Sequence, residues 1–125
     1  MIKYKYNKET DIVETIFEGE ISFKEMLDYI ISIREDKELP NRLKIFSDTT
    51  KGKLKERFRS KNLKQFLDEN KATLEQKEFI YDAFVISGTF EMALAMLYRE
   101  LINYDNYKFN VFSTKKAAIE WLNKF

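Results

Sequence analysis

The spacing of apolar residues along the chain changes between strict alternation and a helical repeat. Apolar and polar residues alternate over 2–6, and β-branched residues dominate 12–18. These two segments predict strands joined by the polar turn 7–11, and therefore a hairpin whose second strand ends at Gly19.

Two helices are predicted after this hairpin. Ser22-Phe23-Lys24-Glu25 has the Ser-x-x-Glu form of a capping box, and the apolar residues that follow keep a helical spacing as far as Ile33. Apolar residues over 63–67 mark a second helix. Because Thr73-Leu74-Glu75-Gln76 is a second possible capping box, we expect this helix to be interrupted or to restart near Thr73.

Three further strands are expected. A short one covers 43–46 and ends in the turn 47–50, and the last covers 107–112. The segment 79–87 is the clearest, because its residues 83–86 are apolar on both faces, which is typical of a central strand covered by helices on both sides.

The remaining helices are expected at 89–103 and after Thr114. The order is then β-β-α-β-α-β-α-β-α over one domain, 1–125. A hairpin followed by strand-helix alternation predicts an α/β fold with a mixed sheet, antiparallel at its start and parallel afterwards, covered by helices.

Composition narrows the possible chemistry. The 125 residues include no His, no Cys and only three Gly, and the net charge is +1. A catalytic triad, a thiolate nucleophile, a zinc ribbon and a glycine-rich phosphate loop are therefore excluded, and we expect no metal and no cofactor. An enzyme is the least favoured class, because no convergent set of carboxylate, Lys or Tyr residues is visible along the chain.

The chain also lacks an apolar leader or membrane segment. Its longest apolar run is Met92 to Tyr98, far shorter than a bilayer requires. With the mixed charges and the absence of Cys, this predicts a soluble cytoplasmic protein.

Three stretches carry a resemblance to a known family. They are Leu43-Lys44-Ile45-Phe46-Ser47-Asp48, Asp82-Ala83-Phe84-Val85-Ile86, and Phe109-Asn110-Val111-Phe112-Ser113-Thr114 followed by Ala117-Ala118 and Trp121-Leu122. With the order of elements, they resemble the STAS-like family, which shares the fold of bacterial anti-sigma-factor antagonists and is related to CRAL-TRIO lipid-transfer domains. The resemblance implies a fold and a regulatory or carrier role, not an activity.

Short hydroxyl and acidic residues end the later strands. In open sheets, ligands bind beyond the carboxyl ends of parallel strands, where helix N-termini present free N–H groups. Ordinary helix capping explains the same residue types and is the alternative. The candidate ligand or partner rim consists of Asp48, Ser87, Thr89, Ser113 and Thr114.

Asp48-Thr49-Thr50 stands where antagonist STAS proteins carry an Asp-Ser-Ser-Gly motif that a partner kinase phosphorylates on its second Ser. The resemblance therefore implies Thr50, or its neighbour Thr49, as a phosphoacceptor. Phosphate would add about two negative charges and could make or break a protein contact. Lys51 departs from the family motif, so a plain strand-end turn is the alternative.

Every second residue is basic between 51 and 61. In an extended conformation these cations would share one side and could bind anions such as phosphate. A solvated loop is the alternative, and nucleic acid is disfavoured because no aromatic array accompanies the cations. The candidate anion-binding strip is Lys51, Lys53, Lys55, Arg57, Arg59 and Lys61.

Two functional hypotheses follow. The first is a non-enzymatic STAS-like regulatory or interaction module that acts on a protein partner or as a homodimer. The alternative is a carrier or sensor of an apolar or amphipathic small molecule, held between helix 89–103, the region 51–67 and the sheet. Met92, Met96 and Tyr98 extend the apolar surface of that helix, which suits a lipid-like pocket or a dimer contact; deep packing is the alternative.

Overall fold

The computed structural model describes residues 1–56, 59–86 and 88–125, and it has the element order that the sequence predicts. One sheet contains five strands in the order β1-β2-β3-β4-β5, with β1 antiparallel to β2 and the other neighbours parallel. The α/β class with a mixed sheet is therefore confirmed. The strands are β1 (Ile2–Asn7), β2 (Ile12–Ile21), β3 (Arg42–Leu54), β4 (Phe79–Val85) and β5 (Tyr107–Phe112).

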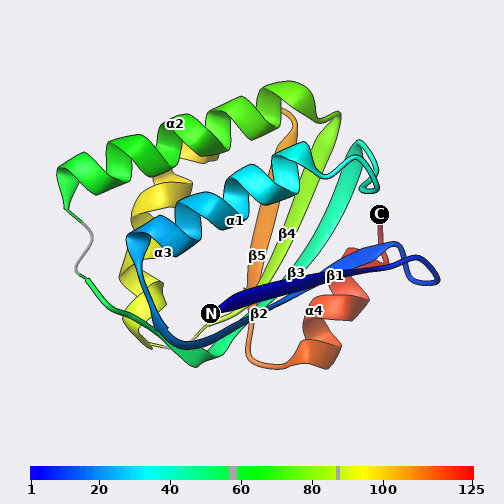
Figure 1. Cartoon of the computed structure of the whole chain (residues 1–125). Coiled ribbons are helices and arrows are strands. Elements are labelled where there is room, and N and C mark those ends of the chain that lie inside the picture. Colours follow the sequence, from blue (N-terminus) through cyan, green and yellow to red (C-terminus); the bar gives the residue numbers. More distant parts are fainter. Residues whose placement is uncertain (57–58, 87) are drawn as a thin grey trace.

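The helices cover the two faces of the sheet unequally. Because each parallel crossover advances by one strand in the same direction, right-handed connections place α1, α2 and α3 on one face (Figure 1). Only α4 covers the opposite face. The helices are α1 (Phe23–Glu35), α2 (Ser60–Gln76), α3 (Gly88–Leu101) and α4 (Lys115–Leu122). Among the described residues, none of these helices has the length and apolar character needed to cross a bilayer.

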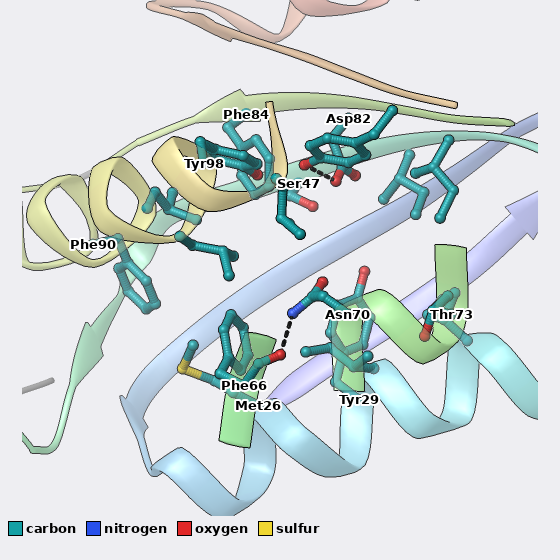
Figure 2. Close-up of a pocket in the computed structure, with 18 of the residues that line it drawn as sticks. Met26, Tyr29, Ser47, Phe66, Asn70, Thr73, Asp82, Phe84, Phe90 and Tyr98 are labelled. Carbon is teal, nitrogen blue, oxygen red and sulfur yellow. Dashed lines mark hydrogen bonds between the residues drawn. The ribbon is translucent and has the colours of Figure 1, made fainter. Parts of the chain in front are cut away.

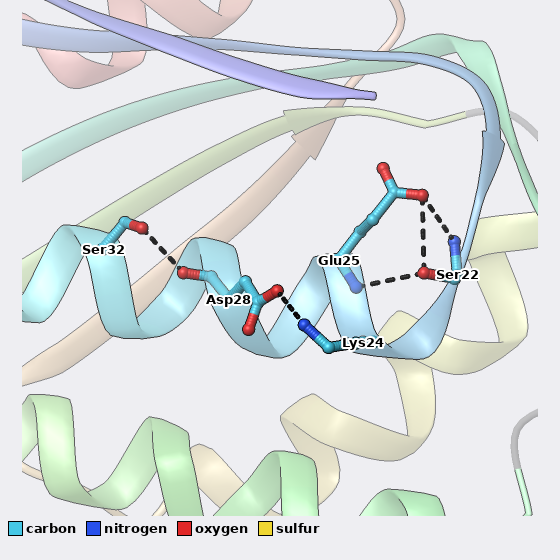
Figure 3. Close-up of polar contacts among 5 residues, drawn as sticks. All are labelled: Ser22, Lys24, Glu25, Asp28 and Ser32. Atoms are coloured by element: carbon cyan, nitrogen blue, oxygen red, sulfur yellow. Dashed lines mark hydrogen bonds and ion pairs between the residues drawn. The ribbon is translucent and has the colours of Figure 1, made fainter.

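The capping box at the start of α1 is confirmed (Figure 3). The backbone N–H of Glu25 donates to Ser22 Oγ at 3.1 Å, and the backbone N–H of Ser22 donates to Glu25 Oε1 at 3.3 Å. These bonds satisfy two N–H groups that a helix start leaves without partners, and so they fix where α1 leaves β2.

The expected ends of β2 and β3 were wrong. β3 does not stop at 47–50 but runs to Leu54, and β2 continues past Gly19 to Ile21. The two strands keep pairing because the register shifts between Ile16 and Glu18, where β3 contains one extra residue, a β-bulge. Beyond this bulge, acidic residues of β2 stand opposite basic residues of β3, which favours the longer ladder.

The expected interruption of α2 near Thr73 was also wrong. The helix is continuous from Ser60 to Gln76, and the Thr73 hydroxyl donates to the Glu69 carbonyl at 3.0 Å instead of capping a new helix. Thr73 is buried against the core, and this bond satisfies its hydroxyl within the helix.

Helices cover both faces of β4, as predicted for 83–86. Tyr81, Ala83 and Val85 face α4, whereas Ile80 and Phe84 belong to the larger core beneath α1, α2 and α3. Alternation places Asp82 on this second face, in the midst of that core.

Candidate functional site

A cavity of about 90 Å³ lies between the sheet and the three helices on its larger covered face. Met26 and Tyr29 of α1, Phe66 of α2, and Phe90 and Tyr98 of α3 form part of its wall (Figure 2). Strands β2, β3, β4 and β5 each contribute at least one side chain. The cavity therefore depends on segments that span most of the chain.

Aromatic rings make up much of this wall. The Phe17 and Phe90 rings meet edge to face at 5.5 Å, and those of Phe84 and Tyr98 do so at 5.6 Å. Tyr98 also stacks on Phe109 of β5, with ring centroids 3.5 Å apart. Such ring pairs hold their geometry well, so the wall is mostly rigid and apolar.

Asp82 is the single charged residue among the described residues that line the cavity. One carboxylate oxygen, Oδ2, accepts a hydrogen bond of 2.7 Å from the Tyr107 hydroxyl (Figure 2). In the described part of the chain, no group donates a hydrogen bond to its other oxygen, Oδ1. Asp82 retains some exposed area, and it lines the cavity.

Burial changes the ionisation of this group. It raises the pKa of Asp82 from 3.8 to about 7, although the hydrogen bond from Tyr107 opposes the rise. Burial and the nearby Asp82 charge also raise the pKa values of Tyr98 and Tyr107 well above 10. The Tyr98 ring lies beside that of Tyr107, with centroids 5.7 Å apart. The Tyr107 proton is directed at the Asp82 carboxylate.

A second polar group lies on the same wall. The hydroxyls of Thr15 and Tyr29 are hydrogen-bonded, with their oxygens 2.8 Å apart. Thr15 and Ser47 are register partners on β2 and β3, so the sheet places both hydroxyls under α1. Burial raises the pKa of Tyr29, which therefore stays neutral. Across the cavity, the amide of Asn70 donates to the Phe66 carbonyl at 2.8 Å (Figure 2).

An ion pair joins the two helices above the cavity. Arg34 of α1 approaches Glu69 of α2 at 2.8 Å, and the same guanidinium donates to the Glu69 backbone carbonyl at 3.2 Å. The two side chains are 14% and 30% exposed, so water screens this pair less than a surface pair. It helps to keep α1 beside α2 over the cavity.

The predicted rim does not line this cavity. Thr114 caps α4 by accepting a hydrogen bond of 3.2 Å from the Ala117 N–H, and Thr89 accepts one of 3.3 Å from the Leu54 N–H. Both hydroxyls thus have structural partners, as the capping alternative requires. Ser87 lies outside the described residues.

The two predicted phosphoacceptors, Thr49 and Thr50, lie on opposite faces of β3, and the remaining rim residues, Asp48 and Ser113, lie on and after different strands. Asp48 lies within β3 and not at its end, which corrects the expected position, while Ser113 is exposed after β5. Thr49 is 1% exposed and donates to the Val85 carbonyl at 2.9 Å, so a kinase cannot reach it in this fold. Thr50 is exposed and donates to Asp48 at 2.6 Å; its phosphorylation stays a prediction.

The predicted anion-binding strip does not form one continuous row. The extended conformation ends at Leu54, and Glu18 and Glu20 stand opposite Lys51 and Lys53 in the ladder, where they offset the positive charge. Arg57 lies outside the described residues. The other five cations are exposed, three near the end of β3 and two at the start of α2; they are Lys51, Lys53, Lys55, Arg59 and Lys61.

Sequence reasoning did not single out the polar cluster of Asp82, Tyr98 and Tyr107. One signal was present: Asp82 alternates with Ile80 and Phe84 on one face of an otherwise apolar strand. The tyrosines gave no such signal, since aromatic residues are ordinary core residues. No group of three acidic side chains that could hold a metal ion occurs in residues 1–56, 59–86 and 88–125.

Comparison with known proteins adds no relative. No family model matches the chain, and neither a curated protein nor a solved structure matches it significantly.

Proposed function

We propose that this chain is a non-enzymatic binding module that holds a small amphipathic molecule in the cavity beneath α1, α2 and α3. The observation that carries the proposal is the free oxygen of Asp82 in a wall that is otherwise apolar and aromatic. A mostly apolar cavity with a few convergent polar groups is the usual form of a small-molecule site. Membership of the STAS-like family remains a prediction from the resemblance.

The cavity volume limits the ligand. Sites for drug-sized molecules typically measure about 300–1,000 Å³, whereas this cavity has about 90 Å³. It therefore suits several water molecules or a compact ligand of a few carbon atoms. A lipid chain would require α1 and α2 to separate, against the ion pair between Arg34 and Glu69.

The hydrogen bonds favour binding over catalysis. Stabilising negative charge that develops on a substrate needs hydrogen-bond donors that are free to turn toward it. Here the Tyr107 hydroxyl already donates to Asp82, and the Tyr29 hydroxyl is engaged with Thr15. The cluster offers the acceptor oxygen of Asp82, which suits the binding of a donor.

Xenon tests whether this space accepts a guest, because apolar cavities bind it without specific chemistry. Xenon should shift the NMR signals of residues around the cavity, and Leu94→Phe, which fills the cavity from α3, should abolish the shifts. Ile119→Phe is the control, because Ile119 packs against the core on the opposite face. Xenon shifts that survive in Leu94→Phe, or are missing in the unsubstituted chain, would contradict the proposal.

A different observation favours a second function, self-association. The outward stripe of α3 is apolar and continues into the turn after it: Met92 and Ala95 are exposed on the helix, Met92 at 74%, and Ile102 just beyond its end is 67% exposed. Glu91 and Arg99 flank the same stripe, and neither forms an ion pair within the described residues. Beside it, a groove of about 720 Å³ separates α3 from β5.

The occupant that fits this stripe is a second copy of the chain. In an antiparallel pair of α3 helices centred on Ala95, Glu91 of each copy meets Arg99 of the other, and the two Ala95 side chains meet at the axis. A two-fold contact of this kind is self-complementary in charge and in apolar surface.

A charge exchange tests this pairing in the analytical ultracentrifuge. Arg99→Glu should convert a dimer to monomer by placing like charges together, and adding Glu91→Arg should restore the dimer. A monomeric unsubstituted chain, or a dimer that Arg99→Glu leaves intact, would refute the homodimer.

A further inference from the structure

We propose, resting on the function assigned to the cavity, that its ligand is a compact apolar ammonium ion whose N–H donates to Asp82 Oδ1. The ligand class is thus a small primary amine with a short branched or cyclic hydrocarbon group. Four properties of the cavity carry this inference: its charge, its unused hydrogen-bonding capacity, its aromatic wall and its size.

The first property is charge. Asp82 is the sole formally charged residue that lines the cavity within the described chain. The titratable groups that face it are tyrosines: Tyr29 from α1, Tyr98 from α3 and Tyr107 from β5. From α2 the lining polar residues are the neutral Asn70 and Thr73. An ionised Asp82 therefore lacks a compensating cation, and a buried charge without one is unfavourable.

The second property is hydrogen-bonding capacity. Oδ2 of Asp82 accepts a hydrogen bond from Tyr107, and Oδ1 remains available as an acceptor. A guest that supplies donors matches this arrangement. An ammonium supplies both three N–H donors and the missing positive charge, whereas an alcohol supplies only one donor.

The aromatic wall and the size agree with this ligand class. Tyr98 and Phe84 line the wall beside Asp82 (Figure 2), and aromatic faces attract a desolvated cation. The volume of about 90 Å³ admits only a compact hydrocarbon group. A carboxylic acid fits less well, because its ionised form would meet the Asp82 carboxylate.

Three probes of one shape separate these chemistries: isobutylamine, isobutanol and isobutyrate. Dissociation constants are measured by NMR titration between pH 5 and pH 8 with the whole chain. Isobutylamine stays protonated over this range, so the pH dependence reports the protein. Burial raises the pKa of Asp82 to about 7, so its ionised fraction at pH 5 is about 1%. Isobutylamine affinity should therefore fall about 50- to 100-fold from pH 8 to pH 5.

Asp82→Asn removes the charge but keeps an oxygen for Tyr107. In this variant, isobutylamine affinity at pH 8 should fall at least about tenfold and lose its pH dependence. Asp105→Asn, a change at an exposed position, should leave both unchanged. Amide spectra at each pH show that every variant remains folded.

Other outcomes overturn the inference in distinguishable ways. Isobutanol binding as tightly as isobutylamine at pH 8 would refute the ammonium but leave the binding function intact. Isobutyrate binding more tightly than isobutylamine at pH 8 would show that the cavity does not select a cation, and would also refute the ammonium. If no probe binds and xenon also fails to enter, the inference and the proposed function both fall.

Discussion

The substitution Asp82→Asn should stabilise the ligand-free protein, and only at neutral and alkaline pH. Burial raises the pKa of Asp82 from 3.8 to about 7, so the folded state holds a proton that the unfolded chain releases near pH 4. The contribution of Asp82 to the free energy of unfolding therefore falls as the pH rises from about 4 to about 7, and it is constant above pH 7. One pKa unit corresponds to about 1.4 kcal/mol, so Asp82 destabilises the fold by about 4 kcal/mol at pH 8.

Asparagine avoids this loss because it stays neutral and still offers an oxygen to Tyr107. For a chain of this size, about 4 kcal/mol corresponds to a rise in melting temperature of about 10–15 °C at pH 8. At pH 4 the change should be within about 1 kcal/mol, because Asp82 is then protonated in the fold. Thermal unfolding followed by circular dichroism at both pH values measures the difference, with Asp105→Asn as the control. An equal shift at both pH values, or a lower melting temperature at pH 8, would refute the reasoning.

Three further substitutions test the packing around the site by urea unfolding. Glu69→Gln should destabilise the fold by about 1–2 kcal/mol, because it removes the half-buried charged partner of Arg34. Asp68→Asn is the control: it breaks the exposed pair with Lys64 and should change stability by less than about 0.5 kcal/mol. Gly52→Ala should destabilise by about 1–3 kcal/mol, since its Cβ would lie 3.0 Å from Phe17 Cβ; Gly88→Ala, which meets nothing within 4 Å, should not. Ser22→Ala should destabilise the fold by about 1 kcal/mol, because it removes the side-chain cap of α1, and should speed amide hydrogen exchange in that helix. Unchanged exchange in α1 would argue against the capping role.

The order of elements was predictable because it depends on local periodicity. The capping boxes show the limit of such signals. Ser22-Phe23-Lys24-Glu25 begins a helix, whereas Thr73-Leu74-Glu75-Gln76 has the same form and lies inside one. The difference is tertiary: Thr73 packs into the core with its hydroxyl bonded to Glu69, so nothing breaks the helix there.

The cavity and the full length of β3 depend on contacts between distant residues. Lys51 and Lys53 extend the strand because Glu18 and Glu20 stand opposite them, a pairing that no local pattern encodes. The polar cluster similarly requires Asp82 of β4 to contact Tyr107 of the neighbouring strand β5. A single carboxylate in an apolar strand indicated a special position in the sequence. Its contact with Tyr107 could not be predicted, because it depends on how β4 and β5 are aligned.

The titration of Asp82 itself tests the account most directly. The chemical shift of its side-chain carboxyl carbon, followed against pH in ligand-free protein, should give an apparent pKa of about 7, and isobutylamine should lower that value. A pKa below about 5 in the free protein would show that the carboxylate is well solvated or compensated. That result would contradict the enclosed acceptor site on which the binding function depends.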